Sequence, residues 1–155
     1  MKKKLLKFIK EIIVFILIAT VLSNAISLYR SMRLNKSTLI SSLHVDKDKP
    51  VMVHFWATWC PVCKTEIDNI QRLSKDYQVI TIVVKSGTTQ EIKNYLKKRD
   101  FNFNIINDED ASLAQKFGVN IYPTTFIYNK NKELVFSDVG YTSTLGLYLR
   151  MWWAS

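Results

Sequence analysis

Two cysteines, Cys60 and Cys63, are separated by only Pro61 and Val62, and the 155-residue chain has no others. A structural disulfide usually closes a longer loop, because it then restrains the unfolded chain more strongly. A pair this close contributes little stability in that way, so its spacing favours a chemical role in thiol–disulfide exchange. The nucleophile in that exchange is a thiolate, which requires a lowered pKa and an accessible sulfur.

The residues around Cys60 predict a strand that runs into a helix. Val51–Trp56 is a short apolar run typical of a buried strand, and Pro61 suits the first helical turn, where its missing N–H does no harm. We therefore expect the Cys60 sulfur at a helix amino terminus, where free backbone N–H groups and the helix dipole stabilise an anion. Cys63 lies one turn further on, in a more buried position, from which it would attack a mixed disulfide at Cys60.

Hydrophobic periodicity predicts the order β-α-β-α-β-α-β-β-α for the rest of the chain. The polar segment 129–132 makes the last two strands an antiparallel hairpin. Asp110 is predicted to cap the third helix, which Gly118 ends. The predicted strands are 51–56, 79–84, 104–106, 124–128 and 134–136, and the predicted helices are 61–77, 87–100, 110–118 and one from about 143. The apolar face predicted for the last helix consists of Leu145, Tyr148, Leu149 and Trp152, and Trp152 and Trp153 are expected to close that helix.

The first 36 residues carry most of the chain's net charge of +9. A basic nucleic-acid-binding face on the remainder is therefore not expected. Five lysines fall within residues 1–10, and an apolar segment follows them, so we predict a cytoplasmic basic segment (1–10), a transmembrane signal-anchor (11–29) and a tether (30–37). The alternative is a signal peptide cleaved after Ala25. Both interpretations export a domain formed by residues 38–155.

Two motifs about sixty residues apart resemble those of exported thioredoxin-like proteins of the TlpA/ResA/CcmG branch. Residues 56–63 (WATWCPVC) resemble the active-site signature, and residues 117–119 (FGV) with 122–126 (YPTTF) resemble the second signature. The tail, residues 140–150, is also similar to the suppressor-of-copper-sensitivity protein D subgroup. The resemblance covers the chain from about Thr38 to the end. It implies an α/β thioredoxin-like fold, with a central mixed β-sheet flanked by helices. The apolar segment described above adds one predicted transmembrane helix before this fold.

The resemblance also implies roles for individual residues. Pro123 would be a cis-proline that faces Cys60, and the Tyr122 backbone would pair with an extended substrate strand. Glu66 matches an acid that tunes the cysteines or relays protons, although a solvated acid in the first helical turn is the simpler interpretation. Trp59, next to Cys60, is expected to shape the surface that substrates meet.

His54 departs from the pattern of thioredoxin proper, which has a buried aspartate at this position. A histidine in a buried strand is usually neutral and satisfied by hydrogen bonds, and this is the first interpretation of His54. In the second, His54 relays protons to Cys63 with a pKa near the working pH.

Together these residues predict a monomeric protein-disulfide reductase at the outer, periplasmic face of a bacterial cytoplasmic membrane. It would need no cofactor besides the Cys60–Cys63 disulfide, take electrons from a membrane donor, and reduce disulfides of exported proteins. Dedicated reduction of apocytochrome c is the alternative, and net oxidation ranks third, because a CPVC sequence does not fix the direction of electron transfer.

In another class of function, the two cysteines with His44 and His54 would bind zinc or copper. We expect no metal, since structural zinc sites rarely take a ligand from a core strand.

Overall fold

The computed structural model describes residues 10–15, 18, 40, 43, 45–46 and 48–155. The chain forms two compact units, Met1–Arg33 and Leu34–Ser155. Residues 10–15 are helical, and no helix among the described residues is long and apolar enough to cross a membrane. Most of the predicted signal-anchor and all of the tether lie outside the described residues, so these segments and their boundaries remain predictions.

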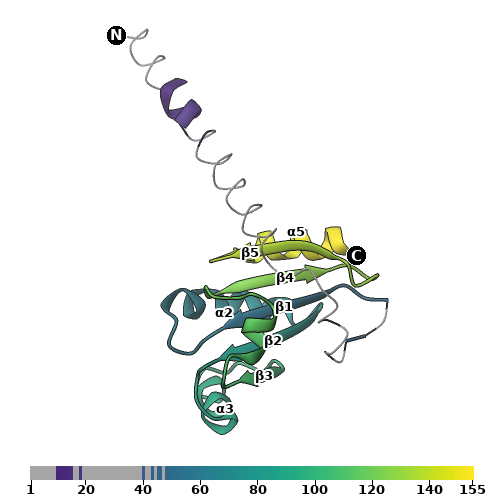
Figure 1. The fold of residues 1–155 in the computed structure, drawn as a ribbon. Helices are drawn as coiled ribbons and strands as arrows, with labels where there is room; N and C mark the ends of the chain where they lie inside the picture. Colours follow the sequence, from purple (N-terminus) through teal and green to yellow (C-terminus); the bar gives the residue numbers. More distant parts are fainter. Residues whose placement is uncertain (1–9, 16–17, 19–39, 41–42, 44, 47) are drawn as a thin grey trace. The chain divides into compact units, whose positions relative to one another are not determined.

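The second unit contains the predicted strands and helices in the predicted order (Figure 1). The strands are β1 (Val51–Trp56), β2 (Gln78–Val84), β3 (Ile105–Asp108), β4 (Thr124–Tyr128) and β5 (Leu134–Val139). The helices are α2 (Pro61–Leu73), α3 (Thr89–Lys97), α4 (Ser112–Lys116) and α5 (Thr144–Ala154).

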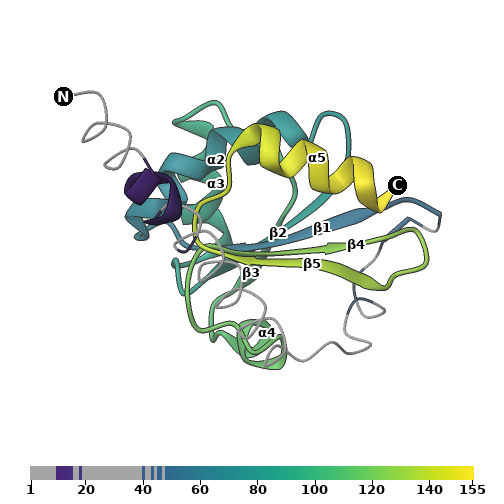
Figure 2. The same ribbon diagram turned by 90° about the horizontal axis from the view of Figure 1, so that it is seen from above.

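The strands form one mixed sheet in the order β3-β2-β1-β4-β5. β1 and β2 are parallel, as are β2 and β3, whereas β4 is antiparallel to both β1 and β5. Helices α2, α3 and α5 cover one face of the sheet, and α4 lies on the other (Figure 2). Every residue of the central strand β1 is buried, which explains why all of them except His54 are apolar. The thioredoxin-like α/β fold is therefore confirmed.

The alternation of side chains along β1 divides the core between the two faces. Val53 and Phe55 pack with Phe117 on the α4 face. On the opposite face, Met52 packs against α2 and α5, while Trp56 joins the cluster that contains both cysteines. The active-site end of α2 thus rests directly on the buried core.

The predicted apolar face of α5 is wrong. The helix buries Leu147, Met151 and Ala154 against the sheet and α2. Of the predicted residues, Tyr148 is only half-buried, and the other three are exposed: Leu145, Leu149 and Trp152. The helix carries apolar residues on two opposite sides, so periodicity identified one apolar face while tertiary packing used the other.

Helix ends also differ from the prediction at α2, α3 and α4. α3 spans Thr89–Lys97 rather than 87–100, with Thr88 as its N-cap. α2 ends at Leu73 rather than Tyr77, because the Asp76 and Tyr77 amides both donate to the Leu73 carbonyl and form a turn. At α4 the N-cap is Ala111. The Asp110 carboxylate accepts from the Ser112 amide, but the buried Asp108 carboxylate accepts from the next two amides. The predicted end of α4 at Gly118, which has a φ of 69°, is confirmed.

Candidate active site

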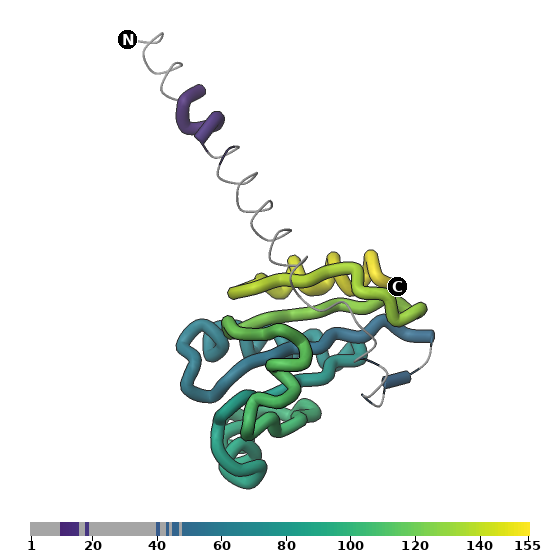
Figure 3. Tube along the Cα trace, in the orientation of Figure 1, coloured from purple at the N-terminus to yellow at the C-terminus, as the bar shows by residue number. Residues whose placement is uncertain are grey.

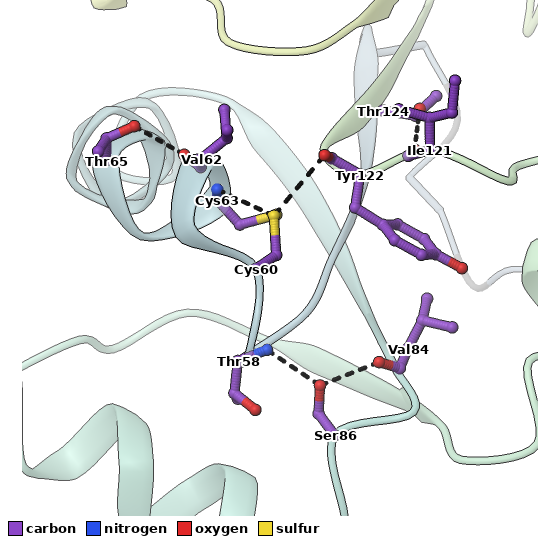
Figure 4. Close-up of a disulfide and its surroundings, with 10 residues drawn as sticks. All are labelled: Thr58, Cys60, Val62, Cys63, Thr65, Val84, Ser86, Ile121, Tyr122 and Thr124. Carbon is purple, nitrogen blue, oxygen red and sulfur yellow. Dashed lines mark hydrogen bonds between the residues drawn. A yellow bond between two sulfur atoms is a disulfide. The ribbon is translucent and has the colours of Figure 1, made fainter.

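Cys60 is the N-cap residue of α2, and Cys63 lies within the first turn. The two are joined by a disulfide, with their Cα atoms 5.3 Å apart. The Cys63 amide donates to Cys60 Sγ over 3.2 Å (Figure 4). Cys63 is 1% exposed and Cys60 5% exposed. The structure therefore places Cys60 at the helix amino terminus, as the sequence predicted, and Cys63 beneath it.

The loop that carries Tyr122 and Pro123 lies against the disulfide. The chain returns from α4 to β4 through this loop (Figure 3), and the Tyr122–Pro123 peptide bond is cis. The Tyr122 carbonyl oxygen lies 3.6 Å from Cys60 Sγ (Figure 4). The Gly140 amide donates to the Pro123 carbonyl over 2.8 Å and ties the loop to the end of β5. The two sequence motifs therefore meet at Cys60.

Exposed apolar side chains lie in the segments on either side of the disulfide. Trp59 is 55% exposed, its indole Nε1 donates to the Lys85 carbonyl, and its ring meets the Tyr122 ring edge-on at 5.9 Å. Val62 follows Cys60 on α2, and Ile121 precedes Tyr122; both side chains are exposed. The sequence pointed to Trp59 but offered no reason to single out Val62 or Ile121, whose exposure depends on the loop packing.

Glu66 is fully buried, one helical turn beyond Cys63. Its Oε1 accepts from the Thr142 amide over 3.0 Å, whereas Oε2 has no hydrogen-bond partner among the described residues. Burial raises the pKa of Glu66 to about 7; the Thr142 hydrogen bond opposes this rise, and the nearby charge of Asp138 adds to it. Glu66 is therefore a buried carboxyl that titrates near neutral pH. The interpretation as a solvated acid in the first turn is wrong.

Sequence reasoning missed the residues that surround Glu66. Asp138, on β5, pairs with Arg150 of α5, with Nε and Oδ2 2.9 Å apart, and burial raises the pKa of Asp138 while Arg150 opposes the rise. Asn69 Nδ2 donates to the Thr142 carbonyl over 3.1 Å and holds the same turn. The sequence offered one signal for Asp138, an aspartate at a position of a strand that faces inward. Its ion-pair partner Arg150 was not predictable, because that contact depends on how α5 packs.

His54 is buried on the α2 side of β1, with its Nδ1 2.9 Å from Thr125 Oγ1 of β4. Burial lowers the pKa of His54 to about 3. The ring is therefore neutral at physiological pH, as in the first of the two interpretations. Proton relay through His54 would require a pKa near the working pH, and this environment does not provide it.

Replacing Thr125 by Val removes the hydroxyl that pairs with His54 while preserving the side-chain shape. We expect the free energy of unfolding to fall by about 1–3 kcal/mol, because a buried polar nitrogen loses its partner. Urea unfolding measures this loss. The pH profile of disulfide reduction should be unchanged, and a shifted profile would instead assign His54 a role in proton transfer.

The described residues contain no group of three or more His, Cys, Asp or Glu side chains placed to hold a metal ion. The two cysteines are bonded to each other, and Nδ1 of His54 is hydrogen-bonded to the Thr125 hydroxyl. His44 lies outside the described residues. The alternative metal site therefore has no assembled ligand set in the described part of the chain.

Comparison with known proteins gives one consistent family. Residues 31–137 match the AhpC/TSA family. A thioredoxin-like protein of Haemophilus influenzae is 33% identical over 98% of this chain and 96% of its own length. Sporulation thiol-disulfide oxidoreductase A of Bacillus subtilis is 26% identical over 61% of this chain and 62% of its own length.

Solved structures agree with this assignment. The exposed lipoprotein thioredoxin Etrx1 of Streptococcus pneumoniae matches with a TM-score of 0.60 and 26% identity, over 68% of this chain and 84% of its own. StoA of Bacillus subtilis, at 22% identity and a TM-score of 0.60 over 71% of this chain and 85% of its own, shares the fold. The chain therefore belongs to the AhpC/TSA family, as one of its thioredoxin-like thiol–disulfide oxidoreductases.

Proposed function

We propose that the chain is a protein-disulfide reductase attached to the outer face of the cytoplasmic membrane. The observation that carries the proposal is the Cys60–Cys63 disulfide at the amino terminus of α2, beside the Tyr122–Pro123 loop and exposed apolar side chains. Membrane attachment is supported by the five leading lysines and the apolar segment that follows them. Exported proteins are the proposed substrates.

The reaction begins from the dithiol form. The Cys60 thiolate attacks one sulfur of a substrate disulfide, so a mixed disulfide forms and one substrate thiolate leaves. Cys63, deprotonated, then attacks Cys60 Sγ, which releases the second substrate thiol and leaves the Cys60–Cys63 disulfide seen here. Two electrons pass to the substrate. A dithiol donor at the membrane returns the protein to the reduced form by the reverse exchange.

Two features of the site support steps of this reaction. The Cys63 amide, 3.2 Å from Cys60 Sγ, is placed to stabilise negative charge on that sulfur. Glu66 lies three residues after Cys63 on α2, which makes the two side chains neighbours on the helix surface. With a pKa of about 7, Glu66 is suited to accept the Cys63 proton before the second attack.

The Tyr122–Pro123 loop is the proposed substrate platform. Its Tyr122 carbonyl oxygen, 3.6 Å from Cys60 Sγ, faces the position at which a substrate sulfur must arrive. An extended substrate segment could pair with this backbone while its side chains contact Trp59, Val62 and Ile121. The platform thus recognises backbone and apolar surface rather than one particular sequence.

The reduction potential tests the direction of the reaction. We expect equilibration against glutathione or dithiothreitol to give a value below about −200 mV, in the range of reductants such as glutaredoxins and thioredoxin. Pro61 and Val62 favour this outcome, because neither side chain can donate a hydrogen bond to the Cys60 thiolate. A value near about −120 mV, like that of a strong oxidant, would instead assign the protein to net oxidation.

A further inference from the structure

α5 presents a second apolar face, which is exposed among the described residues of the second unit. Leu145, Leu149 and Trp152 recur at helical spacing on the side opposite the buried Leu147, Met151 and Ala154. Leu145 is 69% exposed, Leu149 55%, Trp152 68% and Trp153 73%. We call these four exposed side chains the outer face of α5.

The outer face carries no charge. Arg150 is the only charged residue of α5, and its guanidinium forms an ion pair with Asp138 of β5. Nε lies 2.9 Å from Oδ2, and Nη2 donates a hydrogen bond to Oδ1 over 3.2 Å. Scattered apolar side chains are normal on a protein surface, but two adjacent tryptophans and two leucines in one row indicate an interaction site.

We propose that the outer face of α5 docks onto a lipid surface, in the interfacial layer of the membrane. The inference rests on the attachment proposed above. The predicted tether of residues 30–37 spans at most about 29 Å when fully extended, so an anchored domain stays close to the bilayer. Tryptophan concentrates at the membrane interface, and an apolar helix face without charges buries itself in that layer. A lipid surface therefore fits this row better than a charged protein partner.

The geometry of α5 keeps the disulfide free when this face is docked. The Thr144 hydroxyl donates to Asn69 Oδ1. The Tyr148 hydroxyl donates to the Asp76 carboxylate and lies 3.3 Å from the Arg72 carbonyl oxygen, so α5 runs alongside α2 in the same direction (Figure 2). Trp152 and Trp153 therefore lie toward the carboxyl-terminal end of α2. Cys60 is at its other end, and a helix of 13 residues is about 20 Å long. Docking through the tryptophans would leave the disulfide open to exported substrates.

Bromolipid quenching of tryptophan fluorescence tests the docking on the full chain in phosphatidylcholine–phosphatidylglycerol vesicles. The chain has four tryptophans, of which Trp56 is buried beside the active site and Trp59 is exposed there. The difference in fluorescence between the wild type and a W152F/W153F variant gives the emission of the two α5 tryptophans. The difference between the wild type and a W59F variant gives the emission of Trp59. We expect at least about twofold quenching of the α5 signal by lipids brominated near the headgroups, and little quenching of Trp59.

A matched pair of variants tests whether the outer face causes the contact. Leu149→Lys places a charge in the row, and Val135→Lys places the same charge on β5, where Val135 is 37% exposed. We expect L149K to lose most of the quenching of the α5 signal and V135K to keep it. Both variants should reduce insulin disulfides at the wild-type rate in detergent, because neither residue contacts the active site.

Flotation of the same vesicles separates the possible failures. If the protein floats but the α5 tryptophans are not quenched, docking is wrong and attachment stands. If the protein does not float and is not quenched, docking and attachment are both wrong, while insulin reduction in the same sample still reports on the proposed reductase activity. If the α5 emission is blue-shifted without quenching and copies cross-link through α5, a second copy covers the face and the lipid proposal is overturned.

Discussion

Replacing Cys63 by Ser is expected to stop turnover and trap substrate proteins as mixed disulfides on Cys60. Cys60 keeps its place at the helix amino terminus, where the residue-63 amide donates to its sulfur, so the first attack still occurs. The second attack cannot, because Cys63 supplies the thiolate that releases the substrate. Non-reducing gel electrophoresis of cells that express the variant measures the trapped species, and the insulin reduction rate should fall to that without protein.

Cys60→Ser is the matched control for this prediction. It should be equally inactive in insulin reduction, but it should trap nothing, because Cys63 lies inside the first turn of α2 whereas Cys60 is the residue beside the Tyr122 loop. Alkylation of the reduced wild type at neutral pH should modify Cys60 before Cys63. Faster modification of Cys63, or mixed disulfides in the Cys60→Ser variant, would reverse the assigned roles.

Replacing Glu66 by Gln is expected to remove a large part of the pH dependence of stability. Burial raises the pKa of Glu66 from 4.5 to about 7 in the native oxidised protein, so the native state holds this proton more tightly than the unfolded chain. The wild type should therefore lose stability as the pH rises from about 4.5 to about 7. A shift of this size corresponds to a loss on the order of 3 kcal/mol. The glutamine side chain does not titrate, so the variant should lack this component.

Urea unfolding of the oxidised proteins between pH 4 and 8 measures the difference between wild type and variant. Asp138 also has a raised pKa, but it is present in both proteins, so the difference reports Glu66 together with its interaction with the Asp138 charge. A Glu66→Gln protein that follows the wild-type curve in parallel would show that Glu66 is not a buried acid titrating near neutral pH.

The same variant should slow release of the mixed disulfide, because the glutamine amide cannot accept the proton of Cys63.

The local parts of the site were predictable because they depend on neighbours in the chain. A buried strand that ends before Cys60, with proline at the next position, predicts a helix whose first turn holds both cysteines, and α2 confirms this. The run of β-branched residues in β2 and the polar turn between β4 and β5 are signals of the same kind, and both predictions are confirmed. The resemblance to thioredoxin-like proteins added the loop at Pro123 opposite Cys60.

The environments of the buried polar groups depend on tertiary contacts. Thr142, the hydrogen-bond partner of Glu66, is 76 positions away from it in the sequence. The Asp138 charge, which adds to the raised pKa of Glu66, comes from the edge strand β5. Likewise, Thr125 satisfies His54 only because β4 pairs with β1 in one particular register. These contacts join strands and helices far apart along the chain, and no local pattern records them.

The orientation of α5 shows most clearly where a sequence pattern is insufficient. Both sides of the helix are apolar, so hydrophobic periodicity identifies two faces and cannot choose between them. The choice follows from packing: Leu147 and Met151 fit against Met52 and Ile70 in the core, while Arg150 reaches Asp138. The residue pattern was enough to establish the chemistry, a disulfide at a strand–helix junction. Packing of the folded chain selected which acid is buried beside that disulfide and which row of apolar side chains stays exposed, because burial depends on contacts among distant parts of the chain.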